Sequence, residues 1–600
     1  MDSPILSFPV ELWSMVGLYL DPSSIASCIL VCRNFHYSFT PLLWRNIDCH
    51  RSQIFDAITL RKHKRSIEIL TISQFLPKEY GYIIYRRLNL LSLVDICKHV
   101  NDTTSGACID LAVSLAVLAN INTHIKHLEA SFVDNELSNR FWYAIATKWV
   151  NPISLSVKCS KPLEEKSQLS ENRKHKNKRK YTSIDSDIND DDYSFNHKND
   201  GDGNDEQDLE NEVYGDEMSY FWEACSRFKN LSLAMPTIPY EGMVGNCSME
   251  RIERLTLSKL WQAYHPTTDV STRHSVHELN LMDACPNLRY LSWDLNMSKF
   301  PTERFTSSLR LRTWPLLTAL VLRNVCVLLD SKIADILSLV PNPLQEFELQ
   351  DSLFGAEAFW ILSSRHFQTL ERLSTKGCNG FTSEMVRQVL TGCSRLKYFG
   401  ADYMTMKDAS REDDVWVCRG LQHFFIFFAY QQDQDQEEEE EEAQGQEKVQ
   451  QTQLDQDEMN NRRVLGKIAG LSELKSLVLS MDMYALPSYP KGMQESARMG
   501  RSLKLRLDDG LEQLEGLICL EHLGFDRTIQ EMSLQDVEWM MRHWRKLQTV
   551  SGGMNRDGVQ HSRLVDALDE RRVVCSPRMF GYYQIYSEVV DSALDCEDGL

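Results

Sequence analysis

The sequence predicts an α/β fold in which a short strand and a helix are repeated many times, preceded by a small helical module. Two observations predict this architecture. Pairs of apolar residues three positions apart recur every 25–29 residues through residues 288–424 and resume at residue 474. Residues 6–48 instead carry apolar side chains at helical spacing. A unit of the repeat length cannot bury its own apolar face, so consecutive units must stack on one another.

The repeated phrase has the form L-x-x-L, with other apolar residues at some positions. The clear phrases are Leu288/Leu291, Leu317/Leu320, Leu344/Phe347, Leu370/Leu373, Leu396/Phe399, Leu421/Phe424, Leu474/Leu477, Leu520/Leu523 and Leu547/Val550. Weaker candidates upstream are Ile67/Leu70, Ile125/Leu128, Ile252/Leu255 and Val276/Leu279. A period of roughly 20–29 residues with this phrase resembles that of leucine-rich repeats. The resemblance implies an irregular solenoid with a horseshoe shape.

One repeat shows the whole expected cycle. Residues 370–373 start a strand, Cys378 and Asn379 turn the chain, and Ser383 begins a helix that ends at Cys393. The apolar stripe of that helix consists of Val386, Val389 and Leu390. No polarising neighbour of Cys378 or Cys393 is evident in the sequence, so we expect both thiols to serve as small packing groups.

The first 49 residues form the helical module. Pro9 is suited to a helix start, and residues 21–22, Asp-Pro, end that helix because proline supplies no backbone donor. The module resembles an F-box, the helical domain that binds the Skp-type adaptor of cullin-based ubiquitin ligases. The matching segments are Phe-Pro-Val-Glu-Leu at 8–12, Leu-Asp-Pro at 20–22, Leu-Val-Cys-Arg-Asn-Phe at 30–35 and Pro-Leu-Leu-Trp at 41–44. Phe8 replaces the usual leucine.

This resemblance implies that the chain is the substrate receptor of an SCF-type ubiquitin ligase. The F-box would hold the adaptor, and through it the cullin and RING subunits, while the repeats would hold an unidentified protein target for ubiquitination and degradation. The resemblance assigns adaptor binding to Phe8, Pro9, Leu12, Leu20, Pro22, Leu30, Val31 and Trp44. A second interpretation is a repeat scaffold that keeps an F-box-like cap without recruiting a ligase.

The expected domain boundaries follow from the phrase and from composition. They are 1–49 for the F-box, 50–160 for a first and poorly patterned repeat segment, 161–217 for a disordered basic and acidic insertion, 218–430 for repeats, 431–461 for a disordered Gln/Glu-rich insertion, 462–555 for C-terminal repeats, and 556–600 for a tail or cap. The two insertions lack apolar periodicity.

The net charge of −20 belongs to the insertions. Residues 185–217 and 431–459 carry net charges of −13 and −11, so the rest of the chain is close to neutral. We therefore expect no nucleic-acid partner. The chain also lacks a signal peptide and a membrane-spanning segment, which favours a cytoplasmic or nuclear protein. The basic run at 173–180 is either a nuclear-import signal or a solvated linker.

The sequence contains no phosphate-binding loop, nucleophile elbow or zinc-ligand pattern. We therefore expect no catalytic activity, cofactor or metal, although residues 556–600 lack the repeat phrase and leave room for a hidden enzyme.

Alternation along the strands predicts where the target binds. If Phe424 and Ile426 face the core, their neighbours face the concave side of the solenoid. The predicted target-binding patch consists of Arg372, Lys376, Tyr398, His423, Phe425 and Phe427. Two alternatives remain: the chain's own insertion covers the patch, or the register differs by one residue and the phenylalanines are core.

Overall fold

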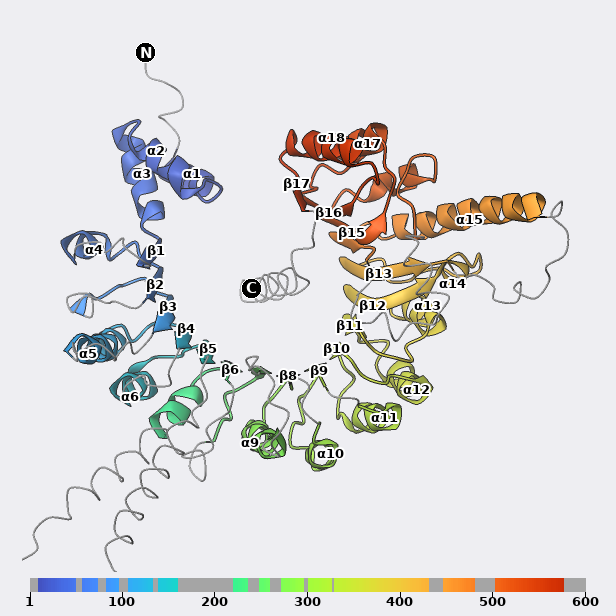
Figure 1. The fold of residues 1–600 in the computed structure, drawn as a ribbon. Helices are drawn as coiled ribbons and strands as arrows, with labels where there is room; N and C mark the ends of the chain where they lie inside the picture. Colours follow the sequence, from blue (N-terminus) through green and yellow to red (C-terminus); the bar gives the residue numbers. More distant parts are fainter. Residues whose placement is uncertain are drawn as a thin grey trace, which may run out of the picture. The chain divides into compact units, whose positions relative to one another are not determined.

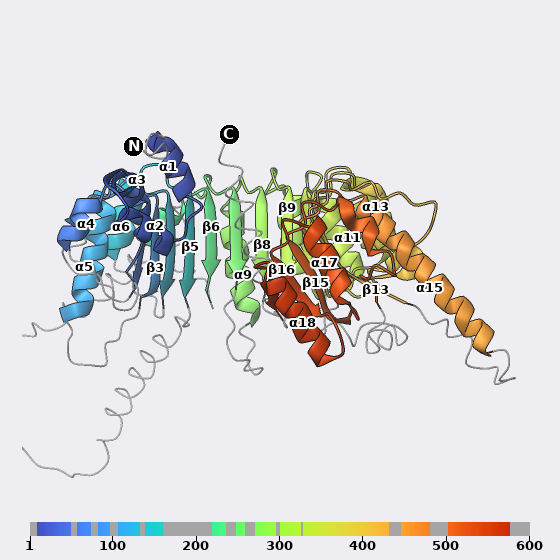
Figure 2. The same cartoon turned by 90° about the horizontal axis from the view of Figure 1, so that it is seen from above.

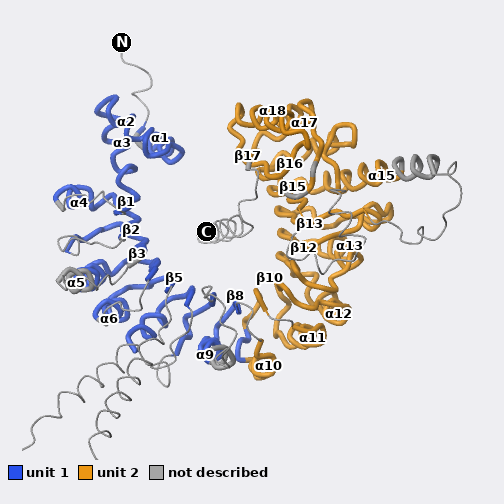
Figure 3. The backbone as a smooth tube through the Cα atoms, in the orientation of Figure 1, with its two compact units in different colours: residues 1–296, 313–315 blue, residues 297–312, 316–600 orange. Residues whose placement is uncertain are grey.

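The computed structural model describes residues 9–49, 57–73, 82–96, 106–132, 139–159, 219–235, 248–258, 271–295, 300–325, 328–430, 446–480 and 502–576. The chain divides into two compact units (Figure 3). Unit 1 comprises Met1–Asn296 and Thr313–Pro315, and unit 2 comprises Met297–Arg312 and Leu316–Leu600. Each unit is described by itself.

Unit 1 begins with three helices and continues as a parallel sheet. The helices are α1 (Val10–Gly17), α2 (Pro22–Ile29) and α3 (Arg33–Leu43). The strands are β1 (Asn46–Cys49), β2 (Ile69–Ser73), β3 (Leu90–Ile96), β4 (His127–Phe132), β5 (Ser154–Cys159), β6 (Asn230–Ala234), β7 (Arg254–Ser258) and β8 (Tyr290–Asp294). Each strand pairs in parallel with the next one along the chain, as in a solenoid.

Helices connect these strands and lie on one side of them (Figure 1). They are α4 (Ala57–His63), α5 (Gly106–Ile121), α6 (Asn139–Lys148) and α9 (Ser271–Asp283). Parallel neighbours need such crossover connections, because a tight turn can join only antiparallel strands. The view of Figure 2 shows the strands of unit 1 side by side.

Unit 2 has the same alternation. Its strands are β9 (Ala319–Arg323), β10 (Glu346–Leu349), β11 (Arg372–Ser374), β12 (Tyr398–Thr405), β13 (His423–Ala429), β14 (Ser476–Val478), β15 (His522–Ile529), β16 (Thr549–Gly553) and β17 (Val574–Ser576). Its helices are α10 (Thr302–Arg310), α11 (Asp330–Leu339), α12 (Ala356–Arg365), α13 (Ser383–Gly392), α14 (Met406–Ala409), α15 (Gln446–Ala469), η5 (Leu511–Gly516), α17 (Leu534–His543) and α18 (Gly558–Asp569).

The register of unit 2 aligns one apolar residue from every strand. These residues are Leu320, Phe347, Leu373, Phe399, Phe424, Leu477, Leu523, Val550 and Cys575. All but Cys575 are almost completely buried. The second residue of every clear phrase lies in this row or, for Leu291, in β8. The strand positions that these phrases predict are therefore confirmed.

The repeat around α13 also matches its predicted cycle. The helix spans Ser383–Gly392, and Thr382 caps it by accepting a hydrogen bond from the backbone N–H of Met385 at 3.3 Å. The predicted stripe of Val386, Val389 and Leu390 is buried. Cys378 and Cys393 are buried too, and burial raises the pKa of both thiols. A raised pKa keeps a thiol protonated, as expected of a packing group.

Several sequence predictions differ from the structure. Val276 and Leu279 lie in helix α9, not in a strand. Strands β3, β5 and β6 were not predicted, although Leu88/Leu91 and Phe228/Leu231 have the phrase spacing. Residues 446–461 were expected to be disordered but belong to α15, because Gln and Glu favour helices even without apolar periodicity.

The C-terminal boundary at 555 was placed too early. Helix α18 and strand β17 continue the alternation, and Cys575 of β17 pairs with Val550 of β16. The repeat phrase fails here because its first leucine is missing. Residues 161–217, 431–445 and 577–600 lie outside the described residues, as does the basic run at 173–180.

Candidate adaptor-binding and target-binding surfaces

The turn between α1 and α2 is fixed by a side-chain cap. Asp21 accepts hydrogen bonds of 2.9 Å from the backbone N–H groups of Ser23 and Ser24. Both serine hydroxyls also donate to this carboxylate, and these bonds hold the pKa of Asp21 well below its usual range. Pro22 occupies the first turn of α2, where its missing N–H costs nothing. The Asp-Pro pair therefore ends one helix and starts the next, as predicted.

An aromatic cluster joins helices α1 and α3. The Trp13 ring of α1 contacts the Phe35 ring of α3 with centroids 4.6 Å apart, and Phe35 contacts Phe39 at 5.4 Å. Gly17 lets α1 approach α3 closely, because a Cβ at this position would lie 2.2 Å from Leu42 Cδ1. This aromatic core is thus small and is built by α1 and α3.

Many other apolar side chains of the module are exposed to solvent. One set of exposed large apolar side chains lies in α1, in the two residues after α1 and in the two residues after α2. It consists of Leu12, Met15, Val16, Leu18, Tyr19, Leu30 and Val31. Tyr19 is 89% exposed, Leu30 87% and Val31 69%. Exposure of several large apolar side chains is typical of an interaction surface.

The structure separates the predicted adaptor-binding residues into two groups. Leu12, Leu30 and Val31 are exposed, and Pro9 and Pro22 are exposed at the starts of α1 and α2. Leu20 is half-buried. Phe8 lies outside the described residues.

Trp44 has an intramolecular partner. Its ring stacks on the His63 ring of α4 with centroids 4.2 Å apart and an angle of 2° between the planes. This contact joins the end of α3 to the first strand–helix unit. Trp44 thus has a partner within the chain, and its contribution to adaptor binding, by direct contact or by support of the module, stays a prediction.

The predicted target-binding residues of unit 2 come together on one face of the sheet. Arg372, Tyr398 and His423 occupy the same register on β11, β12 and β13. The Arg372 guanidinium carbon lies 4.5 Å above the centre of the Tyr398 ring. Lys376 Nζ lies 4.4 Å above the Phe425 ring, and Tyr398 and Phe425 have centroids 5.2 Å apart. These contacts bring together Arg372, Lys376, Tyr398 and Phe425, whereas the role of the patch in target binding stays a prediction.

Their exposure differs from the prediction. Tyr398, Phe425 and Phe427 are buried to 2–4% exposure, and Lys376 is 9% exposed. Tyr398 and Phe425 form a small apolar cluster with Val478 on the face opposite the main core. These aromatic side chains offer a target little surface. Arg372 and His423 remain half-buried and accessible at the edge of this cluster.

Positively charged side chains surround His423. Burial, together with the charges of Arg372, Lys475 and His522, lowers the pKa of His423 to about 3. His423 Nδ1 lies 3.0 Å from Ser476 Oγ on the next strand. Sequence reasoning missed Lys475, Ser476 and His522, although all three lie within two residues of predicted phrases.

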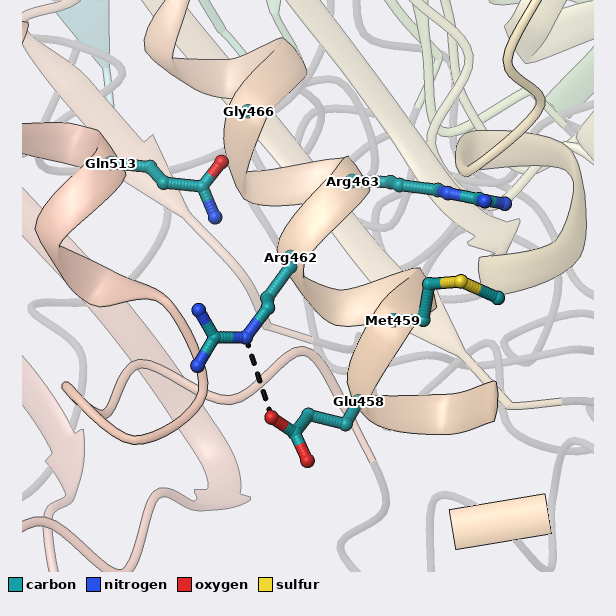
Figure 4. A pocket seen from close by; sticks show the side chains of 6 residues that line it. All are labelled: Glu458, Met459, Arg462, Arg463, Gly466 and Gln513. Atoms are coloured by element: carbon teal, nitrogen blue, oxygen red, sulfur yellow. Dashed lines mark hydrogen bonds and ion pairs between the residues drawn. The ribbon is translucent and has the colours of Figure 1, made fainter. Parts of the chain in front are cut away.

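A shallow depression lies between α15 and η5 (Figure 4). Its volume is about 540 Å³, and its lining consists of Glu458, Met459, Arg462, Arg463, Gly466 and Gln513. Arg462 is paired with Glu458 at 3.3 Å, and Arg463 is paired with Glu412. Its charged groups are therefore matched within the chain.

Across the described ranges, no group of three or more His, Cys, Asp or Glu side chains is arranged to hold a metal ion. In the same part of the chain, no helix has both the length and the apolar character to cross a membrane.

Comparisons with known proteins support the N-terminal assignment. Residues 5–50 match the family model described as F-box-like. No curated protein sequence matches the chain. Among solved structures, a chain of the Rad7 and Elc1 complex from yeast aligns over 90% of this chain and 88% of its own length, with 10% identity and a TM-score of 0.32. A TM-score this low does not establish a shared fold. The N-terminus of this chain is an F-box-like domain.

Proposed function

We propose that the chain is the substrate receptor of an SCF-type ubiquitin ligase, with a leucine-rich-repeat solenoid behind its F-box. The observation that carries the proposal is the set of exposed apolar side chains of the F-box-like domain, which includes Leu30 and Val31. A Skp-type adaptor would cover this surface and connect the chain to cullin and RING subunits. The repeats would hold the target protein.

This role needs no catalytic residue in the chain. A receptor accelerates ubiquitin transfer by holding the target near the charged conjugating enzyme, which raises the effective concentration of the target lysine. Both units build their sheets from one short strand per repeat, and such arrays supply extended binding faces. A protein partner is therefore the expected ligand of the repeats.

Co-purification with the adaptor tests the proposal. Wild-type chain should capture the Skp-type adaptor and its cullin, and a Leu30→Asp, Val31→Asp variant should lose at least tenfold in capture. Both side chains are exposed in the structure, so the variant should fold. Trp360→Asp is the matched control, because Trp360 is 66% exposed on α12 of unit 2.

The result separates the receptor from a scaffold that keeps an F-box-like cap. Absence of capture by the wild-type chain contradicts the receptor role and favours the scaffold. Equal loss of capture in the Trp360→Asp control contradicts the assignment of the surface.

A further inference from the structure

Two free cysteines bracket an exposed turn of the F-box-like domain. Cys28 lies in the last turn of α2, and Cys32 directly precedes α3. Leu30 and Val31, which lie between them, are 87% and 69% exposed. Both cysteines are half-buried, whereas most others in the described part of the chain are fully buried. Small reagents can therefore reach this pair of thiols, at a turn that carries part of the proposed adaptor-binding surface.

Backbone hydrogen bonds fold the chain tightly between the two cysteines. The N–H of Leu30 donates to the carbonyl of Ser27 at 3.2 Å. The N–H of Val31 donates to the carbonyl of Cys28 at 3.0 Å, which keeps the Cα atoms of these two residues within about 7 Å of each other. Cys32 is the next residue. A disulfide needs Cα atoms about 4.4–6.8 Å apart, so a rearrangement of this turn alone can join the two cysteines.

The Cys32 side chain also supports the start of α3. Its Sγ accepts a hydrogen bond from the backbone N–H of Phe35 at 3.5 Å, in the position of a helix cap. The ring of Phe35 in turn contacts the ring of Trp13 in α1. A change at the Cys32 sulfur therefore affects both the exposed turn and the contact between α1 and α3.

We propose that Cys28 and Cys32 form a site of reversible oxidation, where a peroxide joins the two thiols in a disulfide and thereby weakens adaptor binding. This inference rests on the proposed receptor function and adds a means of regulating it. Leu30 and Val31 lie within the ring that the disulfide closes, so their side chains move with the turn. The Cys32 sulfur also leaves its place at the start of α3. After oxidation, the adaptor would meet a different apolar surface.

The reaction consumes one peroxide for each disulfide. One thiolate attacks an oxygen atom of hydrogen peroxide, the O–O bond breaks, and hydroxide leaves a sulfenic acid on that sulfur. The second thiolate attacks the sulfenic sulfur, forms the S–S bond and displaces a second hydroxide. The protons released by the two thiols convert both hydroxides to water. The cysteines are oxidised and the peroxide is reduced, and an added dithiol reverses the step by thiol–disulfide exchange.

Peptide mapping of the full-length chain provides the first readout. No lysine or arginine precedes Arg33, so the tryptic peptide that ends there contains Cys28 and Cys32 and no other cysteine. After brief treatment with hydrogen peroxide, this peptide should have lost two hydrogen atoms and should take up no alkylating reagent. Dithiothreitol should restore both thiols. Alkylation of both thiols after treatment, or their bridging to other cysteines, would overturn the proposal.

Adaptor capture provides the second readout. We expect the reduced chain to capture the Skp-type adaptor and the treated chain to capture about tenfold less, which corresponds to the loss of one large apolar contact. Dithiothreitol should restore capture. In the Cys28→Ser and Cys32→Ser variants, peroxide treatment should not change capture. Serine is also a good helix cap, so Cys32→Ser should keep the start of α3 intact.

Cys519→Ser is the matched control. Cys519 is half-buried like the pair but belongs to unit 2. This variant should lose capture on treatment as the wild type does, and its resistance to peroxide would assign the effect to another thiol. Met15 is 58% exposed and can be oxidised too, but a thiol reagent does not restore methionine from its sulfoxide. A loss of capture that dithiothreitol does not reverse, or that persists in both cysteine-pair variants, would therefore overturn the proposal.

The two readouts separate this inference from the receptor function. If the reduced chain captures no adaptor, the receptor function fails, and peptide mapping still tests the disulfide. If the reduced chain captures the adaptor and treatment forms no disulfide, only this inference fails. A disulfide that forms without weakening capture also overturns the proposal, because oxidation would then leave the adaptor-binding surface intact.

Discussion

The F-box-like helices and the repeats around β11–β13 differ in the exposure of their apolar side chains. In the helices, Tyr19, Leu30 and Val31 remain exposed although they are large and apolar. In the repeats, Tyr398 and Phe425 are buried even on the face that lies opposite the main core. An apolar surface left open gains free energy only when a partner covers it. The exposed side chains of the first region are therefore available to a partner, whereas the apolar side chains of the second region are already buried within the chain.

This difference indicates how each region recognises a partner. Burial of one large apolar side chain contributes about 1.5–3 kcal/mol, so a partner that covers a few residues of the F-box-like domain gains most of its affinity from them. The repeats offer the half-buried Arg372 and His423 in place of such groups. A partner that contacts these two residues would be recognised by charge and hydrogen-bond direction, which give specificity more than raw affinity.

The largest expected contrast is the change in the free energy of unfolding when one side chain is truncated in each region. Phe424 is completely buried and contacts the rings of Phe399 and Trp416 with centroids 6.0 and 5.9 Å away. Phe424→Ala should lower the free energy of unfolding by about 3–5 kcal/mol, because it leaves a cavity in the core. Leu30→Ala should change it by less than about 0.5 kcal/mol.

Urea denaturation of the two variants measures this contrast. Retained m-values are the control, since they show that the surface exposed on unfolding is unchanged. A cost above about 1 kcal/mol for Leu30→Ala would mean that Leu30 supports the fold, and the two regions would not differ in the way described here.

Acid should affect the repeats more than the F-box-like domain. His366 Nδ1 accepts a hydrogen bond from the backbone N–H of Leu344 at 2.9 Å, and burial lowers the pKa of His366 from 6.5 to about 4. Between these values the unfolded chain binds a proton that the folded chain does not. The free energy of unfolding should therefore fall as the pH drops from 6.5 to 4, by up to about 3 kcal/mol.

Hydrogen exchange of the amides in α12 and β10 checks the pH dependence. His366→Gln should flatten it, because the amide oxygen can accept the Leu344 hydrogen bond without titrating. The pKa of Asp21 is lowered, so its cap in the F-box-like domain stays ionised over the same interval. Loss of protection in α2 before α12 would contradict the prediction.

The sequence predicts the repeats well because each unit repeats a local pattern. Leu373, Val386 and Leu390 could be placed from spacing alone, since periodicity directly reports the buried face of a strand or helix. Strand β5 escaped prediction for the same reason. Pro152 stands where the first apolar residue of the phrase should be, so Leu155 has no partner three positions earlier.

The candidate sites depend on contacts between residues that are distant in the sequence. Local sequence patterns do not describe such contacts. Alternation placed Tyr398 and Phe425 on the correct face, but their burial depends on neighbours such as Val478 and Lys376. Trp44 matched an F-box position, yet its stacking partner His63 lies 19 residues later and belongs to no motif.

A glycine in the F-box-like domain tests how tightly its small core is packed. Gly17→Ala would bring a Cβ within 2.2 Å of Leu42 Cδ1 and 2.9 Å of Phe39 Cδ1. We expect a loss of about 1–3 kcal/mol in the free energy of unfolding, because the rings and the leucine must move. Gly558→Ala in α18 is the matched control, since a Cβ there meets nothing within 4 Å. If both variants keep wild-type stability, the module is packed more loosely than its three contacting rings indicate.

The smallest effect concerns the junction between the F-box-like domain and the repeats of unit 1. The stacked rings of Trp44 and His63 should show a coupling energy of about 1 kcal/mol in a double-mutant cycle with Trp44→Ala and His63→Ala. Neither single variant should weaken adaptor capture if the two rings act only on each other. Thermal unfolding of the four proteins gives the coupling, and adaptor co-purification gives the second readout. A capture defect in Trp44→Ala that His63→Ala does not share would place Trp44 in the adaptor interface, and the two regions would then meet at this residue.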